Sequence, residues 1–371
     1  MSKKVFKIKI VALLVTVLML LNCTVVTATD FAKGNEAFES VVSDSTYPDN
    51  KVLKRIEKTL EYLLAVQNND GGFPGEAGQK SSRTITDWTI MALCAVGEDP
   101  NSEKWTKNGH SSLDYIESST YSLKATNDYS RTLLALSAGD KGTVYKGEDI
   151  AKKIISFQQE NGQFAQLDQG ERDMVNAHMW AVLALASTGQ EIPNREKACK
   201  WLISQQNEDG GFCWLVGGES DPDDTGIAIA TLNVLGEPQD SVIMKNAVDY
   251  LENQRDEEGG YCWNGQESNI ASDAWVIQGF QAVGKTPDYT HLLSLQSNEG
   301  YFNWTEDKVS SPVLMTAYAM IALSGQSFPV NGICSADEER HKGTVLLCPS
   351  FLGQNRGQEL LFPFAFIWGF R

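Results

Sequence analysis

One short segment recurs along this chain and constrains its fold more than any other feature. The fullest copy reads QNEDGGF, at Gln206–Phe212, where a helix-forming stretch ends. Related copies occupy Gln67–Phe73, Gln158–Phe164, Arg255–Tyr261 and Gln296–Phe302. The glycines predict a tight turn, because glycine enters positive-φ conformations without steric cost. A repeat of this length predicts an architecture built from equivalent units.

A second repeated element is an apolar helix that follows the turn and ends at a glycine. Stretches such as Asp87–Gly97 (DWTIMALCAVG) are apolar nearly all round, which predicts helices buried on every side. The closing glycines are Gly97, Gly139, Gly189, Gly236, Gly284 and Gly325, separated by 42, 50, 47, 48 and 41 residues. An amphipathic helix precedes each apolar one, as at residues 192–206 and 242–254.

Six pairs of one amphipathic and one apolar helix predict an all-α fold. Six buried helices can close into an inner ring with the amphipathic six around it, which is an α6/α6 toroid. We expect it to form a single domain over residues 51–325. An open two-helix solenoid is the alternative, but each of its helices would keep a solvent-exposed face. Residues 326–371 lack the repeat, and we expect an irregular C-terminal tail there.

Charge and cysteine spacing limit the possible partners. The 371 residues carry a net charge of −17, which disfavours nucleic acid and anionic membrane surfaces. The cysteine spacings match no zinc signature. We therefore expect neither a bound metal nor a cofactor.

The first 28 residues have the pattern of a secretory signal peptide. Basic residues precede an apolar run over residues 10–21, and small residues lead up to Ala28. Cleavage after Ala28 would leave a polar lead-in at 29–50 and a secreted or extracytoplasmic protein without a membrane span. The alternatives are an uncleaved membrane anchor at 10–28, which is barely long enough, or lipidation of Cys23.

The frame that starts at Lys197 and ends at Phe212 resembles the QW motif of squalene–hopene cyclases, with Phe212 where that family has tryptophan. With the helix pairs, it resembles the prenyltransferase and squalene-oxidase repeat superfamily over roughly residues 50–325. The resemblance implies an α/α toroid, which enzymes and cobalamin carriers share. Protein prenyltransferases bind zinc through an Asp and a Cys two positions apart. Here the matching place reads Asp273-Ala274-Trp275, so that site is absent.

The segment Asp221-Pro222-Asp223-Asp224-Thr225 is similar to the D-x-D-D-T signature of class II terpene cyclases. The similarity implies that Asp221, Asp223 and Asp224 are catalytic and that Asp223 protonates an alkene or epoxide. Such an acid must keep its proton, and clustered carboxylates raise one another's pKa. The alternative is structural: Asp224 would be a helix N-cap, as would the aspartates that open three other apolar helices, Asp87, Asp128 and Asp273.

Several side chains near the starts of the apolar helices are candidates for the wall of a central ligand cavity. They are Trp88, Tyr129, His178, Trp180, Trp275 and Tyr318. Aromatic faces would stabilise a carbocation formed by protonation. The alternative for the aromatic residues is an ordinary hydrophobic core, and for His178 a buried, hydrogen-bonded histidine.

These features support two kinds of function. The first is an exported terpene-cyclase-like toroid that binds an apolar, isoprenoid-like ligand in its central cavity and cyclises it with Asp223 as the acid. The second is a non-catalytic extracellular toroid that binds a small ligand, similar to the cobalamin carriers, or an interaction module. The acidic signature favours the enzyme. Export and the single toroid favour the binder, because class II cyclases of di- and triterpenes combine two helical domains.

Export generates the first testable prediction. Mass spectrometry of the protein collected from a secreting host should find an N-terminus near Thr29, because signal peptidase cuts after small residues. Soluble cytoplasmic protein that retains Met1 would contradict the prediction.

Overall fold

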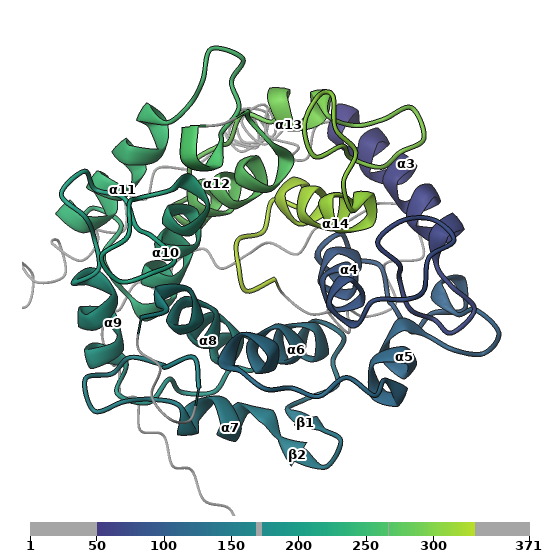
Figure 1. Ribbon diagram of the computed structural model, residues 1–371, viewed down its shortest axis with the longest axis horizontal. Coiled ribbons are helices and arrows are strands. Elements are labelled where there is room, and N and C mark those ends of the chain that lie inside the picture. Colours follow the sequence, from purple (N-terminus) through teal and green to yellow (C-terminus); the bar gives the residue numbers. More distant parts are fainter. Residues whose placement is uncertain (1–49, 168–172, 266, 331–371) are drawn as a thin grey trace, which may run out of the picture. The chain divides into compact units, whose positions relative to one another are not determined.

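The computed structural model describes residues 50–167, 173–265 and 267–330, and six of its helices form a closed inner ring (Figure 1). In ring order these are α4 (Arg83–Ala95), α6 (Thr126–Ala138), α8 (Val175–Ser187), α10 (Pro222–Leu235), α12 (Ile270–Ala282) and α14 (Pro312–Leu323). Each packs against the next, and α14 packs against α4. This closure confirms the all-α toroid and excludes the open solenoid.

Six further helices of the described residues lie outside this ring. They are α3 (Asn50–Val66), α5 (Ser112–Ser118), α7 (Ile150–Ser156), α9 (Arg195–Ile203), α11 (Val242–Asn253) and α13 (Thr290–Ser294). The amphipathic helix α3 buries Val52, Ile56 and Leu63 on one face. The inner helices, in contrast, bury nearly all their side chains, because they contact a neighbour on each side and an outer helix behind.

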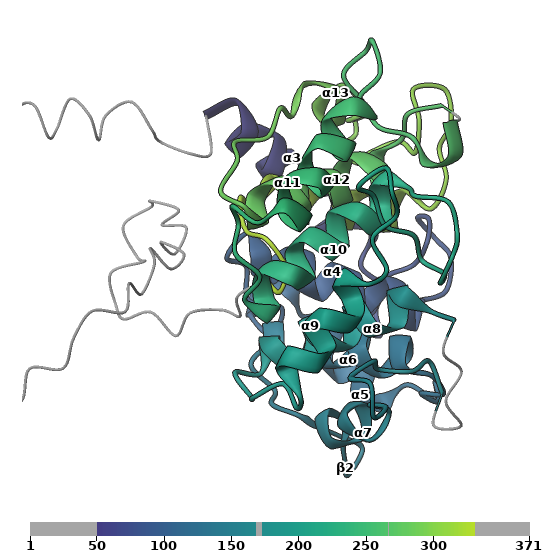
Figure 2. The same ribbon diagram turned by 90° about the vertical axis from the view of Figure 1, so that its left-hand side faces the viewer.

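The other short elements of the described residues lie in the connections. Two turns of 3-10 helix, η1 (Glu103–Trp105) and η2 (Trp263–Gly265), precede α5 and α12. A hairpin of β1 (Val144–Tyr145) and β2 (Glu148–Asp149) precedes α7. Figure 2 shows the ring from the side, with the loops that carry the repeated turns on the right-hand face. Such a loop precedes every inner helix except α6, which a shorter connection over residues 119–125 precedes, and the starts of these helices gather at that face.

The glutamine that opens the repeated turn ties each repeat to the next. Gln206 Nε2 donates to Gly210 O in its own turn and to Ile243 O at the start of α11, both at 2.9 Å. Gln67 and Gln158 make equivalent pairs of bonds. In the last repeat, Gln296 Nε2 donates to Arg55 O on α3 at 3.0 Å, which joins the end of the ring to its beginning.

Two glycines allow a close approach of α10 and α12. A Cβ atom on Gly226 would lie 2.2 Å from Trp275 O, and one on Gly279 would lie 2.9 Å from Gly226 Cα. Real Cβ atoms do not come this close to backbone atoms, so the two helices can pack this way only without side chains at these positions. The contact places the first turn of α10 directly against the turn of α12 that carries Trp275.

The predicted N-caps of the inner helices are wrong. The helices begin earlier: Ser82 caps α4, Asp221 caps α10 and Asn269 caps α12. The aspartates expected as caps therefore lie inside their helices. Asp128, Asp224 and Asp273 are in the first turn, and Asp87 is just beyond it. Short polar side chains upstream already accept hydrogen bonds from the free backbone N–H groups of α4, α10 and α12. This leaves the aspartates for contacts with other parts of the chain.

Several expectations concern segments outside the described residues. These are the signal peptide, nearly all of the lead-in, and the tail from residue 331 onward. No helix among the residues that are described is long and apolar enough to cross a membrane.

The close approach of α10 and α12 predicts that Gly226→Ala destabilises the protein, although replacing glycine by alanine usually stabilises a helix. Gly226→Ala raises intrinsic helix propensity by about 1 kcal/mol. We nevertheless expect a net loss of about 1–3 kcal/mol in unfolding free energy, because the new methyl group must push α12 away. Urea denaturation followed by circular dichroism measures the change.

Gly279→Ala is the matched comparison, with a smaller expected loss because its Cβ clashes less. The double variant should lose less than the sum, since both changes disrupt one contact. A more stable Gly226→Ala variant would contradict the close approach.

Candidate functional site

The candidate site is built on the start of α10. Asp221 is the N-cap, and its Oδ1 accepts a hydrogen bond from the backbone N–H of Asp224 at 2.8 Å. Pro222 takes the first helical position, where a missing N–H costs nothing. The Asp221 N–H donates to Phe212 O at 2.9 Å, which ties the helix start to the repeated turn. The sequence DPDDT thus places three carboxylates on one cap and one helical turn.

Asp224 is linked to the two preceding inner helices by amide side chains. Its Oδ1 accepts a hydrogen bond from Asn176 Nδ2 of α8 at 2.8 Å. Asn127 Nδ2 of α6 donates in turn to Asn176 Oδ1 at 3.2 Å. A chain of polar contacts therefore crosses three consecutive inner helices at the face of the ring that carries the repeated turns.

In the described part of the chain, Asp223 has a carboxyl oxygen without a hydrogen-bond partner, as does Asp221. The Ser272 hydroxyl of α12 hydrogen-bonds to its carboxyl group, while its buried Oδ1 has no hydrogen-bond partner among the described residues. Burial raises the pKa of Asp223 to about 7. The bond from Ser272 lowers the pKa, and the charges of Asp221 and Asp273 raise it further. A large fraction of Asp223 is thus protonated at neutral pH.

The carboxyl group of Asp223 is crowded by neighbouring atoms on nearly all sides, although the residue as a whole is only partly buried. A proton on Asp223 is therefore shielded from bulk water. We use the term ring interior for the space enclosed by the inner helices.

Burial also raises the pKa of the two flanking acids. The charge of Asp224 contributes to the raised pKa of Asp221, which is about 8. For Asp224 a hydrogen bond from Asn176 offsets part of the shift, and its pKa is about 6. Because Asp221 and Asp224 interact, they titrate as a pair. Within the described residues, no three His, Cys, Asp or Glu side chains are grouped to hold a metal ion.

Three tryptophans from alternate inner helices meet at the centre of the ring. Trp88 of α4, Trp180 of α8 and Trp275 of α12 have ring centroids 5.5, 5.6 and 5.7 Å apart in their three pairs. Tyr318 of α14 lies 5.2 Å from Trp88 and 4.7 Å from Trp275. Tilted and edge contacts at these distances are favourable for aromatic pairs. These four candidate residues thus form one aromatic cluster.

A fifth aromatic ring comes from the chain beyond α14. Residues 324–330 turn into the ring interior (Figure 1), and Phe328 lies 5.4 to 6.1 Å from the three tryptophans. Gln326 holds this segment, because its Nε2 donates to Ala95 O on α4 at 2.7 Å. Sequence reasoning missed Phe328 because the repeat pattern ends at Gly325. Its one signal was an apolar residue shortly after the last repeat.

Two other candidates, Tyr129 and His178, point away from this cluster. Tyr129 packs on Phe157, which follows the outer helix α7, with centroids 5.8 Å apart. His178 Nδ1 accepts a hydrogen bond from Phe164 N at 3.1 Å, and its ring lies 4.7 Å from Trp201 of α9. Threonines accept this same bond in three other repeats. Burial lowers the pKa of His178 to about 3, so it is neutral.

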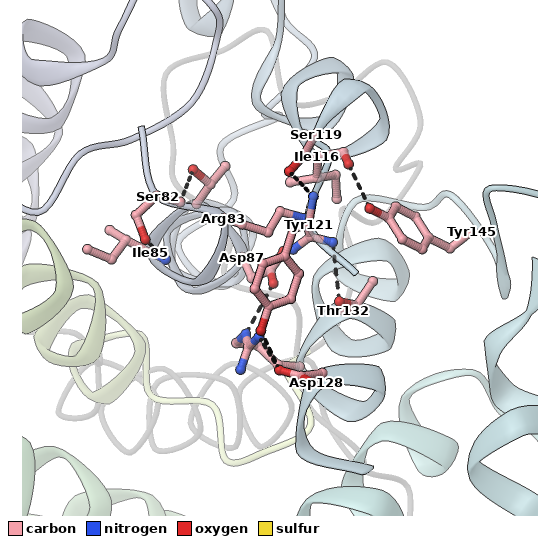
Figure 3. Close-up of polar contacts among 12 residues, drawn as sticks. Ser82, Arg83, Ile85, Asp87, Ile116, Ser119, Tyr121, Asp128, Thr132 and Tyr145 are labelled. Carbon is pink, nitrogen blue, oxygen red and sulfur yellow. Dashed lines mark hydrogen bonds and ion pairs between the residues drawn. The ribbon is translucent and has the colours of Figure 1, made fainter. Parts of the chain in front are cut away.

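An ion cluster between α4 and α6 was also missed (Figure 3). Asp87 pairs with Arg83 of its own helix, and its Oδ2 lies 3.2 Å from Arg131 Nε of α6. Arg131 Nη2 lies 3.2 Å from Asp128 Oδ1. Burial raises the pKa of Asp87, while the two guanidinium groups lower it. The helical spacing of Arg83 to Asp87 and of Asp128 to Arg131 was a signal in the sequence.

Comparison with known families identifies the toroid. A family model, the prenyltransferase alpha-alpha toroid domain, matches residues 46–130 and 129–274, more than half of the chain. The chain belongs to this family. Drimenyl diphosphate synthase from Streptomyces showdoensis is 28% identical over 168 residues, which are 41% of this chain. The match spans only 30% of that relative's length.

Solved structures share the fold at low sequence identity. A type II terpene cyclase, MstE from Scytonema in complex with geranylgeranyl dihydroxybenzoate, has a TM-score of 0.51 and 14% identity; the match covers 76% of this chain and 98% of that one. An α-1,6-mannanase from a Salegentibacter species has a TM-score of 0.55 and 12% identity, with coverages of 73% and 98%. The fold is therefore terpene-cyclase-like.

The MstE match corrects one sequence argument. It covers nearly all of a type II cyclase with this single toroid. A type II terpene cyclase can therefore consist of one such toroid, and the single toroid does not by itself favour a binder over an enzyme.

The raised pKa of Asp223 predicts how stability depends on pH. Its folded-state pKa of about 7 lies above the ordinary value of 3.8, so the folded protein binds more protons than the unfolded chain between these values. Stability from this group is thus present at pH 4 and is lost as pH rises through 7. Asp223→Asn should remove this loss.

His178 acts in the opposite direction, since its lowered pKa adds stability as pH rises. The measurement is therefore the difference in Tm between wild type and Asp223→Asn from pH 4 to pH 8. A difference that does not change with pH would contradict the raised pKa.

Proposed function

We propose that this protein is a class II terpene cyclase in which Asp223 protonates an isoprenoid substrate inside the ring. The observation that carries the proposal is a carboxylic acid that keeps its proton near neutral pH beside an aromatic cluster. Ser272, which hydrogen-bonds to Asp223, lies one helical turn from Trp275 on α12. The charge of Asp223 also acts on the Tyr318 phenol, so both aromatic residues are near the acid.

The reaction needs a proton, a dry site and a means to stabilise positive charge. The O–H bond of Asp223 breaks as a C–H bond forms at an alkene, and the alkene's electron pair is consumed. The resulting carbocation is attacked by a second double bond of the same chain, which closes a ring. Loss of a proton from carbon ends the sequence, so the net change is an isomerisation, and Asp223 regains a proton for the next cycle.

The neighbouring residues support these steps in different ways. All three acids have a raised pKa, so the cluster holds a proton on or beside Asp223. The negative faces of Trp88, Trp180 and Trp275 attract a cation. Burial keeps water, which would quench a carbocation, away from the acid.

Similar proteins support an isoprenoid substrate. MstE, with which this chain shares the toroid, was solved with geranylgeranyl dihydroxybenzoate, and the matching Streptomyces protein is a drimenyl diphosphate synthase. The same toroid also carries an α-1,6-mannanase, so the fold alone would not select this chemistry. The proposal therefore rests on the acid and the aromatic cluster.

We also propose that this activity lies outside the cytoplasm, in a secreted or extracytoplasmic protein. This part of the proposal rests on the signal-peptide pattern of residues 1–28 alone.

Product analysis tests the proposed chemistry. Purified protein is incubated with squalene, oxidosqualene and geranylgeranyl diphosphate, and extracts are analysed by gas chromatography and mass spectrometry. We expect a cyclised isomer from at least one substrate. Asp223→Asn should lower its formation by about 100-fold or more, because an amide cannot supply the proton.

Asp209→Asn is the matched control. Asp209 lies in the repeated turn of the same repeat, is exposed, and hydrogen-bonds to Ser220. Its amide variant should keep wild-type activity. An absence of cyclised product from all three substrates, with tight retention of another small molecule that Asp223→Asn leaves unchanged, would favour the non-catalytic binder instead.

A further inference from the structure

One charged side chain lies at the same level of the ring as the aromatic cluster. The inner helices each place a residue at this level, five positions after the first helical residue, or six in α14. These residues are Trp88, Arg131, Trp180, Ile227, Trp275 and Tyr318. Five of them are apolar or aromatic, and the sixth is Arg131 of α6. A guanidinium group thus occupies a place that tryptophan takes in three other helices.

The orientation of Arg131 is fixed by two carboxylates. Its side chain is 14% exposed, and such a charge is costly to bury without partners. Asp87 lies against its Nε and Asp128 against its Nη2, each at 3.2 Å. Asp128 is itself held, because its Oδ1 accepts from the Tyr121 hydroxyl at 2.6 Å and its Oδ2 from the backbone N–H of Lys124 at 3.1 Å (Figure 3).

This arrangement leaves hydrogen-bond donors of Arg131 available. A guanidinium carries five N–H donors, and the two carboxylates engage only Nε and Nη2. The Tyr121 hydroxyl hydrogen-bonds to the guanidinium as well. These three partners leave two of the five donors, and the side chain keeps 14% of its accessible surface. Arginine with a free edge suits planar or tetrahedral oxyanions, which accept two parallel bonds.

Arg131 and Asp223 act on the same region of the ring interior. The charges of both reach the Tyr318 phenol, although they come from α6 and α10, with α8 between them. A ligand in the ring interior can therefore contact Arg131 with one part and Asp223 with another. This separation also keeps a negative head group away from the acid cluster.

We propose that Arg131 binds the anionic head group, a carboxylate or a phosphate, of the isoprenoid ligand. The inference rests on the proposed function for the isoprenoid part of that ligand. Arg131 thereby makes the ring interior selective for an isoprenoid acid or phosphate over the corresponding neutral alcohol. Asp87 and Asp128 are positioning residues that hold the guanidinium in place.

Equilibrium dialysis at low ionic strength tests this selectivity without requiring turnover. The probes share one chain and differ in head group: geranylgeranoic acid, geranylgeranyl phosphate and geranylgeraniol. We expect wild-type protein to bind the acid or the phosphate at least tenfold more tightly than the alcohol. Comparison of the two anionic probes shows whether the ligand is a carboxylate or a phosphate. Arg131→Gln should remove the preference and leave binding of the alcohol within about threefold of wild type.

Arg83→Gln is the matched control. Arg83 pairs with the same Asp87, but its Nη2 donates to Thr132 and its guanidinium lies over the Tyr145 ring, between α4 and α6. This variant should melt at a lower temperature and keep the head-group preference. Arg131→Lys covers the case in which Arg131→Gln does not fold, and it should keep only part of the preference, since lysine lacks the planar fork.

The inference is overturned if Arg131→Gln, or the folded Arg131→Lys, keeps the full preference, or if Arg83→Gln loses it equally. It is also overturned if wild type shows no preference. These outcomes are separate from those of the cyclisation assay. A head-group preference without any cyclised product would reject the proposed chemistry and keep the anion site. Cyclisation with an unchanged preference in Arg131→Gln would keep the proposed chemistry and reject the anion site.

Discussion

The ring depends on one repeated hydrogen bond, from the side chain of the residue that opens each turn to the backbone of the next repeat. Gln206 makes it to Ile243 O, and Gln296 makes it to Arg55 O, where the last repeat meets the first. In the fourth copy along the chain Arg255 replaces glutamine: its Nε donates to Gly259 O at 3.1 Å and its guanidinium pairs with Asp288. Because this bond also joins the last repeat to the first, it stabilises the closed ring as well as the contacts between consecutive repeats.

Closure of the ring decides whether the polar side chains near the starts of the inner helices are charged or neutral. Once the inner helices have neighbours on every side, any charge near their starts loses water and needs a partner. Asp87 finds two arginines, and the local charges balance. Among the described residues, Asp223 has only Ser272 and other carboxylates beside it and no cation, so its pKa is raised instead. The same burial therefore yields an ion cluster on one side of the ring and an acid on another.

This contrast bears on function more directly than the fold does. The toroid is shared with a terpene cyclase and with a mannanase, whose reactions need different groups. The proposed function rests instead on a carboxyl group with a raised pKa, an aromatic cluster closed by Phe328, and an arginine with unused donors at the same level of the ring. In that proposal, the acid, the aromatic rings and the guanidinium would contact the reactive part, the apolar chain and the head group of one ligand.

The sequence by itself determined the repeat, the number and order of the helices, and the three aspartates, because turn glycines and apolar runs act over a few residues. It also located four of the aromatic residues that meet. It could not determine the helix starts, since Ser82, Asp221 and Asn269 compete locally with the aspartates downstream. Only the tertiary structure decided that Phe328 returns to the ring interior, that His178 faces the outer layer, and that Arg131 joins Asp87. Those contacts depend on how each helix is rotated in a closed ring, which is set by packing between residues far apart in the chain.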